Sequence, residues 1–457
     1  MPRANLVLFH LESLSTLLFD QFGESLPCIR ALSEQSLWFT NAYAAATSTH
    51  MSQASVLYGS DHQLDHIRTY DQTNVRVMDP DKHLFTKLES EGYSVLGIGY
   101  PDVYKKDDDL FHDRKIWNEE RCGRLSYENQ YETFEKKTEA FLRDAAQRDQ
   151  NFALYVHPLI SHLSYKDESK LQTALSHDRM KYGYVTMDTM FAFVMATLES
   201  LGLDDSTAIV LFGDHGDDFY FRGFNNGMCH AVEPYANQVK VPLFIKAPAQ
   251  PPGATDVLTS TNDIYNLTLS LLDSDREITL PRNEFVFSQN LFFNQTPSAI
   301  LNKSFMASDG THSLIVSALG MELYDCRIDP YNLNNLLSFV TLTAEGLVLK
   351  GKFKTAHVHF QNFFTERDVA ELNTTFQALR DALRAHLMGK KQRVLEIVPC
   401  TISIDSYFKT IRPRTYYWRY PLPWRMKIPA MIQRSKGAFR RMLPGFVIRA
   451  LRKCRGK

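Results

Sequence analysis

The segment Thr47–Gly59 reads TSTHMSQASVLYG, with small and hydroxyl-bearing residues in its first half. Met51 to Tyr58 is predicted to form a short helix that ends at Gly59. Thr49 then stands just ahead of the helix N-terminus, where unpaired backbone N–H groups and the helix dipole favour a bound anion. An isolated Thr at such a position is more often an N-cap. Chemical groups elsewhere in the chain decide between these two interpretations.

Short apolar runs alternate with helical segments along the first 270 residues, which predicts an α/β fold with a largely parallel central sheet. Runs of this kind are typical of strands buried on both faces. The expected strands are Asn5–Leu11, Gly92–Gly99, Phe152–His157, Ala208–Phe212 and Val241–Lys246. The expected helices are Ile29–Leu37, Leu84–Glu91, Tyr127–Arg148, Lys181–Leu201 and Asp263–Leu272.

Two of these strands end at groups that bind metal ions. Glu12 follows the first strand, and Asp214 and His215 follow the fourth. Open α/β sheets place their sites at the carboxyl ends of the strands, and carboxylate and imidazole groups together suit a divalent cation. A helix-capping acid is the alternative for Glu12.

Histidines recur near the same strand ends. His157 ends the third strand and His162 follows it, and His230 lies beyond the fourth. A single loop histidine is more often a surface or core residue, but two at the mouth of one strand favour a functional role. Asp217 and Asp218 are expected to be solvated loop acids.

The composition is that of an ordinary globular protein: 457 residues, 44% hydrophobic, 23% charged and a formal net charge of -1. This length allows one large α/β domain and a smaller one. The six cysteines form no CxxC pairs, which indicates free thiols of a reducing compartment. The sequence contains no run of about twenty apolar residues that could span a membrane. A cytoplasmic protein, or a soluble piece of a longer one, is therefore expected.

The sequence pattern changes near residue 298, from alternating strands and helices to consecutive strands. His312–Val316 and Met321–Asp325 alternate like antiparallel strands, and Thr365–Met388 reads as a closing helix. We therefore expect a catalytic domain over 1–297, a smaller α+β subdomain over 298–400 and a tail over 401–457.

The tail is strongly basic: Lys409–Lys457 holds 15 Lys and Arg and no Asp or Glu. Apolar residues recur in it at three- and four-residue intervals, as in a helix that lies on an anionic membrane. Pro429 and Pro444 would divide that helix. We expect peripheral binding to the inner face of a membrane; packing on the acidic body is the alternative. Nucleic acid is not expected, because no recognition motif accompanies the charge.

Together these segments resemble the alkaline phosphatase/sulfatase superfamily over most of Asn5–Leu337. The resemblance rests on several short segments that occur in the family's order: Phe39–Ala44, Gly92–Gly99, Gly213–Gly216, Val241–Ile245 and Glu322–Leu336. The last segment is similar to the C-terminal signature of sulfatases. The resemblance implies an alkaline-phosphatase-like sandwich.

The departures from the sulfatase pattern indicate the subfamily. Sulfatases resemble one another in a Cys (or Ser)-x-Pro-x-Arg core whose first residue becomes formylglycine, but Thr49–Gln53 here reads THMSQ. A Lys-x-His that sulfatases carry after the second strand appears as Tyr100–Asp102. Thr49 and Glu12 are instead similar to the corresponding residues of phosphoethanolamine transferases and lipoteichoic-acid synthases. The spacing of His157, His162 and Tyr165 also resembles the phosphoethanolamine transferases, whose N-terminal bundle of membrane helices is absent from this sequence.

The resemblance implies a site and a reaction. Glu12, Thr49, Asp214 and His215 would hold one divalent cation, most simply Zn²⁺ or Mn²⁺, with Mg²⁺ or Ca²⁺ as alternatives. Thr49 would attack phosphorus, and His162 or His230 would protonate the leaving oxygen. Binding of the substrate would fall to His157, His162 and His230.

The expected function is therefore a metal-dependent phosphoryl or substituted-phosphoryl transferase or phosphoester hydrolase. If the tail binds membranes, the substrate would be a lipid-linked phosphate or a surface-glycan precursor. A sulfuric-ester hydrolase and a catalytically silent binding protein of the same fold are the alternatives.

Overall fold

The computed structural model describes a defined part of the chain, and everything below concerns that part. The described residues are 3–60, 80–99, 122–124, 130–158, 176–218, 230–273, 275–290, 304–317, 320–349, 366–390 and 404–414.

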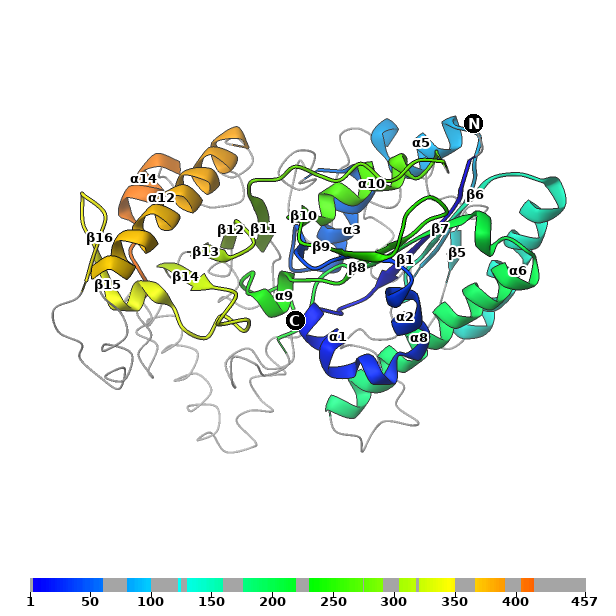
Figure 1. Ribbon diagram of the computed structural model, residues 1–457, viewed down its shortest axis with the longest axis horizontal. Helices are drawn as coiled ribbons and strands as arrows, with labels where there is room; N and C mark the ends of the chain where they lie inside the picture. The colour runs from blue at the N-terminus through cyan, green and yellow to red at the C-terminus, as the bar shows by residue number, and fades with distance from the viewer. Residues whose placement is uncertain are drawn as a thin grey trace, which may run out of the picture.

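A large sheet forms the core of the larger domain (Figure 1). Its strand order is β5-β4-β6-β1-β7-β8-β2-β9. Strand β8 is antiparallel to its neighbours β7 and β2, and the other pairs are parallel. The predicted largely parallel sheet is therefore confirmed. The strands are β1 (Asn5–Leu11), β2 (Leu37–Phe39), β4 (Ser94–Gly99), β5 (Cys122–Arg124), β6 (Phe152–Val156), β7 (Thr207–Gly213), β8 (Leu243–Lys246) and β9 (Gly253–Thr255).

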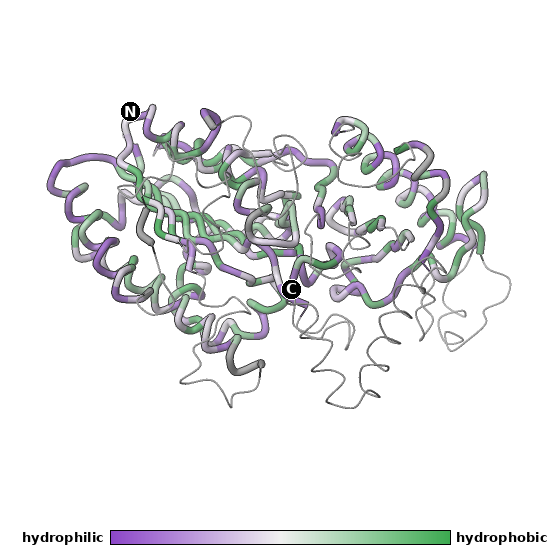
Figure 2. Tube along the Cα trace, turned by 180° about the vertical axis from the view of Figure 1, so that it is seen from behind, coloured by the Kyte–Doolittle hydropathy of each residue, from purple (hydrophilic) through white to green (hydrophobic). Residues whose placement is uncertain are grey.

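Helices cover both faces of this sheet and enclose two apolar cores (Figure 1). One face packs against α1 (Thr16–Phe22), α2 (Pro27–Glu34), α6 (Gln130–Arg148) and α8 (Ser176–Ser200). The other packs against α3 (Thr49–Tyr58), α5 (Leu84–Ser90) and α10 (Ile264–Ser270). Figure 2 shows the strands between these layers as mainly hydrophobic chain.

The alternation of side chains along β1 fixes which groups face helix α3. Leu6 and Leu8 lie in the core on the α3 side, whereas Val7 and Phe9 lie in the core on the α8 side. Successive strand residues point to opposite faces, so even-numbered residues continue toward α3. This period carries the side chain of Glu12, just past the strand, toward the N-terminus of α3.

A second, four-stranded antiparallel sheet builds the smaller subdomain. Its strands follow one another in chain order, and each pairs with the next in antiparallel fashion. The strands expected over His312–Val316 and Met321–Asp325 are therefore confirmed. The four strands are β11 (Val286–Asn290), β12 (Ser304–Ser308), β13 (His312–Ser317) and β14 (Gly320–Asp325).

Helix α12 (Glu366–Gly389) packs on one face of the smaller sheet through an apolar core that includes Phe305, Leu314 and Phe376. The opposite face, with Met306 and Ile315, packs on the larger domain. The α+β character expected for this part of the chain is confirmed. The remaining elements are α9 (Ala236–Val239), α14 (Ile404–Thr410) and the strands β3 (Ala42–Tyr43), β10 (Thr259–Ser260), β15 (Val340–Leu342) and β16 (Leu347–Leu349).

The smaller sheet is joined directly to the segment that carries Thr49. Thr47 N donates to Gln289 O at 3.2 Å, and Gln289 N donates to Ala45 O at 3.1 Å. Gln289 belongs to β11, so the sheet takes one strand from the residues before 298. Backbone hydrogen bonds from the smaller sheet therefore hold the segment that precedes the candidate nucleophile.

Several elements begin or end at other residues than expected, and two of these differences involve the Thr49 segment and the central sheet. Helix α3 begins at Thr49 rather than Met51, with Ser48 at the N-cap. The helix expected over Ile29–Leu37 ends at Glu34, because Leu37–Phe39 enters the central sheet between β8 and β9. Three apolar residues gave no periodic signal from which this short strand could be predicted.

The last described segment pairs with the smaller sheet. Met321 N donates to Arg412 O at 2.9 Å, and Arg414 N donates to Met321 O at 2.8 Å. The predicted basic tail beyond Arg414 lies outside the described residues. Within the described part, none of the helices combines the length and the apolar character needed to cross a membrane.

Candidate metal centre and active site

Three neighbouring strands, β6, β1 and β7, end at one edge of the sheet and bring the predicted groups together. His157 follows β6, Glu12 follows β1, and Asp214 and His215 follow β7. All four side chains are fully buried. The strand ends therefore concentrate two acids and two imidazoles in a space shielded from water.

Thr49 completes this cluster from the first turn of α3. Its Oγ1 lies 3.1 Å from Glu12 Oε1 and 3.0 Å from His215 Nε2, and the residue is 4% exposed. Ser48, not Thr49, stands at the N-cap. The hydroxyl of Thr49 is thus directed at the acid and the imidazole, and the simple capping role is not what the structure shows.

Backbone groups hold Asp214 in a fixed orientation. Its Oδ1 accepts hydrogen bonds from Ser13 N at 2.9 Å and from His215 N at 2.8 Å. Ser13 has a φ of 58°, a left-handed conformation that costs about 1–3 kcal/mol at such positions. Tyr184 donates to Ser13 O at 2.8 Å and supports that conformation. The remaining oxygen of Asp214, Oδ2, faces the cluster, 3.2 Å from His215 Nε2.

His215 is held in the form that can bind a metal ion. Its Nδ1 lies 2.9 Å from Gly216 O, which can only accept a hydrogen bond, so Nδ1 carries the proton. Nε2 then presents its lone pair toward Thr49. Burial lowers the pKa of His215, which favours this neutral imidazole.

The loop after β7 depends on a glycine. A Cβ added to Gly216 would lie 2.1 Å from Asn237 O and 2.5 Å from Ser15 Cβ. Only a residue without a side chain allows this approach, which brings the loop against α9.

The donor atoms fit a small divalent cation. Glu12 Oε1, Thr49 Oγ1, Asp214 Oδ2 and His215 Nε2 contribute separations of 3.0 to 3.9 Å among the measured pairs. Four ligands around Zn²⁺ at ordinary bond lengths lie about 3.3 Å from one another. The four groups predicted to hold a metal ion are therefore arranged as such a site requires.

The electrostatics of the two acids also favour a cation between them. Burial raises the pKa of Glu12 well above its usual range, and the charge of Asp214 raises it further. Burial alone would raise the pKa of Asp214 too, but the His215 and His10 imidazoles hold it below its usual range. Two buried carboxylates this close are stabilised when a positive charge lies between them.

The prediction that Asp217 and Asp218 are solvated is wrong, because both are fully buried. Asp217 Oδ1 lies 2.9 Å from His230 Nδ1, and Asn237 Nδ2 donates to Asp218 Oδ1 at 2.9 Å. Both partners, His230 and Asn237, come later in the sequence. Their hydrogen bonds offset the cost of burying the two carboxylates.

His230 lies beside the predicted metal ligands. Its ring centre is 4.6 Å from that of His215, and its side chain is 18% exposed. Burial alone would lower the pKa of His230, but the ion pair with Asp217 outweighs this and raises it. His157 instead contacts Glu12, with Nε2 2.7 Å from Oε2. His162 and Tyr165 lie outside the described residues.

Sequence reasoning missed three buried polar residues next to this cluster: His10, Gln53 and Tyr155. His10 Nε2 lies 3.0 Å from Asp214 Oδ2, and Tyr155 OH lies between His10 and Gln53. The period of two along the strands would have found His10 two residues before Glu12, and Tyr155 two before His157.

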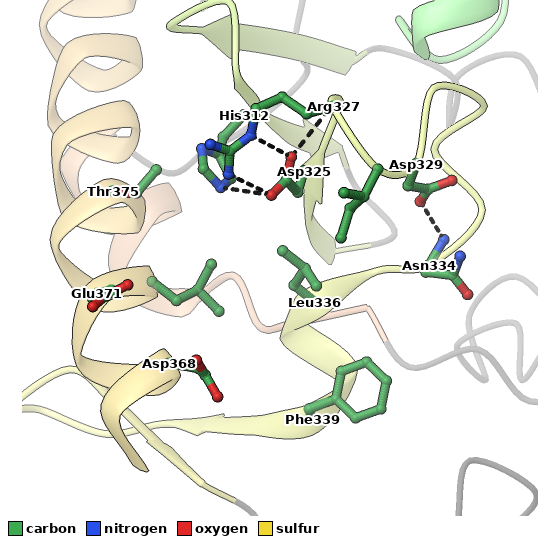
Figure 3. Close-up of a pocket in the computed structure, with 12 residues that line it drawn as sticks. His312, Asp325, Arg327, Asp329, Asn334, Leu336, Phe339, Asp368, Glu371 and Thr375 are labelled. Atoms are coloured by element: carbon green, nitrogen blue, oxygen red, sulfur yellow. Dashed lines mark hydrogen bonds and ion pairs between the residues drawn. The ribbon is translucent and has the colours of Figure 1, made fainter. Parts of the chain in front are cut away.

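A separate cavity of about 670 Å³ lies in the smaller subdomain (Figure 3). Asp325 binds Arg327 and His312 on one side of it, and Asp368 and Glu371 of α12 lie on the other. This cavity is lined by a different set of residues from the cluster around Thr49.

Comparisons with known proteins agree with this fold. The family model described as sulfatase matches residues 4–274. An endo-4-O-sulfatase of Bacteroides thetaiotaomicron is 24% identical over 222 residues, which are 41% of this chain and 43% of that protein. The chain thus matches less than half the length of this relative.

Solved structures share the same architecture. A protein of Bacteroides fragilis, provisionally described as a sulfatase, aligns with a TM-score of 0.59 and 15% identity over 87% of this chain and 98% of that one. A phosphonate monoester hydrolase of Silicibacter pomeroyi aligns with a TM-score of 0.51 and 16% identity over 78% and 100% of the two chains. With the family model matched over more than half of its length, the chain belongs to the sulfatase family.

Proposed function

We propose that this chain is a metal-dependent phosphoryl or substituted-phosphoryl transferase, or a phosphoester hydrolase, that uses Thr49 as its nucleophile. Sulfatase-family enzymes generally use a divalent metal ion. The observation that carries the proposal is the position of Thr49 Oγ1, 3.1 Å from Glu12 Oε1 and 3.0 Å from His215 Nε2. A threonine cannot be converted to the formylglycine of sulfatases, so its hydroxyl itself is the available nucleophile.

The residues of this chain divide the chemistry between them. Thr49 Oγ1 attacks phosphorus, a P–O bond to Thr49 forms, and the bond to the leaving oxygen breaks. Glu12 Oε1 accepts the hydrogen bond of the Thr49 hydroxyl and lies on the path by which its proton leaves. A divalent cation held by Glu12, Thr49, Asp214 and His215 would supply Lewis-acid stabilisation. Zn²⁺ or Mn²⁺ suits this donor set best, with Mg²⁺ or Ca²⁺ as alternatives.

His230 is the proposed proton donor to the leaving oxygen. Asp217 binds its Nδ1 and favours the imidazolium, and Nε2 is the nitrogen through which it would donate. Water or an alcohol then removes the group from Thr49, with the proton returned to His230. His162 remains a second candidate for this role and for substrate binding, and His157 acts through Glu12.

Hydrolysis of three p-nitrophenyl esters by metal-loaded protein tests the proposal: the phosphate monoester, the phosphodiester and the sulfate. Turnover of a phosphoester that disappears in Thr49→Ala and with a chelator is expected. Thr49→Ser, which keeps the hydroxyl, is the matched variant and should retain part of the activity. Phosphoester turnover that persists in Thr49→Ala would contradict the assignment of the nucleophile.

Sulfate-ester hydrolysis is the second candidate, favoured by the name of the endo-4-O-sulfatase relative. Turnover of the sulfate alone in the same assay would replace the first proposal by this one. Metal binding without turnover of any ester would support a strict transferase or a silent binding protein.

We further propose that the basic tail binds an anionic membrane and that the substrate is a lipid-linked phosphate or a surface-glycan precursor. The support is the sequence of Lys409–Lys457, with 15 basic and no acidic residues. Co-sedimentation of the full-length chain with anionic liposomes at low salt, but not with neutral liposomes, is expected. Equal recovery in the supernatant with both would remove the proposal.

A further inference from the structure

A chain of buried polar side chains runs behind the two acids of the candidate metal centre. Gln53 Nε2 lies 2.8 Å from Tyr155 OH, and Tyr155 OH lies 3.0 Å from His10 Nδ1. His10 Nε2 in turn lies 3.0 Å from Asp214 Oδ2. Gln53, Tyr155 and His10 are each at most 1% exposed.

The order of donors and acceptors in this chain is determined by its chemistry. The Tyr155 hydroxyl accepts from the Gln53 amide and so has its own proton to give to His10 Nδ1. The neutral His10 ring then carries its proton on Nε2, the nitrogen that lies 3.0 Å from Asp214 Oδ2. Gln53 lies one turn after Thr49 in α3. The row of polar side chains therefore connects the helix of the proposed nucleophile to Asp214, a proposed metal ligand.

A second histidine, His157, contacts the other acid, Glu12. His157 Nε2 lies 2.7 Å from Glu12 Oε2, and the rings of His157 and His10 are stacked with centres 4.0 Å apart and planes 12° apart. A metal ion lies in the plane of each imidazole that binds it, about 2.1 Å from the nitrogen. Two nearly parallel, stacked rings cannot both meet that condition at one ion, so hydrogen bonding explains this pair better than a shared metal ion.

We propose that His10 and His157 are positioning residues that orient Asp214 and Glu12 for the metal ion, and that Tyr155 and Gln53 fix the tautomer of His10. The inference rests on the metal site of the proposed function. Outer hydrogen bonds of this kind typically change metal affinity by about 10- to 100-fold when they are removed.

Calorimetric titration of the full chain with Mn²⁺ or Zn²⁺ alone tests the inference, using two substitutions of His10. His10→Gln can keep a donor near the position of Nε2, whereas His10→Phe keeps the ring and removes the donor. We expect a loss of affinity of about 10- to 100-fold in His10→Phe and a substantially smaller loss in His10→Gln. Equal losses in the two folded variants would show a packing role and overturn the proposal.

The tautomer provides an independent readout. In ¹⁵N spectra, the neutral form of the His10 ring should carry its proton on Nε2 and not on Nδ1, and the Nδ1 signal should shift in Tyr155→Phe. A neutral His10 ring with its proton on Nδ1 would overturn the proposed order of donors and acceptors from Gln53 to Asp214. Wild-type protein that binds neither metal would instead refute the metal site on which the inference rests, so the two failures are distinguishable.

Discussion

The pair formed by Asp217 and His230 shows how one buried acid sets the charge of a neighbouring base. Asp217 is fully buried, and its Oδ1 lies 2.9 Å from His230 Nδ1. Because the pKa of His230 is raised, the imidazolium persists to a higher pH than that of an ordinary histidine. The ion pair between Asp217 and the His230 imidazolium therefore stabilises the folded state. This stabilisation is fully present below the unfolded-state pKa of the histidine and is lost as the pH rises through its folded-state pKa.

Activity that needs the His230 proton should therefore fall on the alkaline side of the pH profile. Asp217→Asn removes the charge that raises the pKa, so the alkaline limb of kcat should move to lower pH by about 1–3 units. Asp218→Asn is the control, because Asp218 binds Asn237 instead. An unchanged alkaline limb in Asp217→Asn would exclude His230 as the acid.

At the scale of elements, the sequence predicted the main strands and the acids at their ends. Most residues of these strands are apolar, and Glu12 and Asp214 follow such strands directly. The burial of Asp217 and Asp218 was not predictable from local sequence, because it depends on His230 and Asn237, which the fold brings back to the loop. The contacts of His10 with Tyr155 and Asp214 likewise depend on the register of β6, β1 and β7, which local sequence does not show.

Helix α3 ends at a glycine that the fold requires. Gly59 has a φ of 62°, and an added Cβ would lie 2.9 Å from Tyr265 Cβ. Gly92 has a φ of 88° and no atom within 4 Å of an added Cβ, so it is a matched control for backbone strain alone. We expect Gly92→Ala to lower the free energy of unfolding by about 1 kcal/mol and Gly59→Ala by about 1–3 kcal/mol more. Equal losses in urea unfolding would contradict the predicted contact with Tyr265.

At the scale of the whole molecule, one arginine joins the two parts of the chain. Arg414 Nη1 lies 3.0 Å from Glu322 Oε2 of the smaller sheet and 3.2 Å from Tyr235 OH of the larger domain. Arg414 is 9% exposed and Glu322 is fully buried. Removal of the cation would leave a buried acid without its ionic partner.

Arg414→Met should therefore lower the free energy of unfolding by about 3–5 kcal/mol. Addition of Glu322→Gln should restore part of the loss, because the buried charge is then removed as well. Thermal and urea unfolding of both variants provides the measurement. A double variant no more stable than Arg414→Met would argue against the ion pair as the cause.

If Thr49 carries the transferred group, the covalent intermediate can be trapped on its side chain. Metal-loaded protein is mixed with a phosphoester donor labelled in its phosphorus, quenched in acid within the turnover time and digested for peptide mapping. We expect the label on Thr49 and no label at this position in Thr49→Ala. Continued turnover without label on Thr49, or label on another residue, would contradict this role of Thr49.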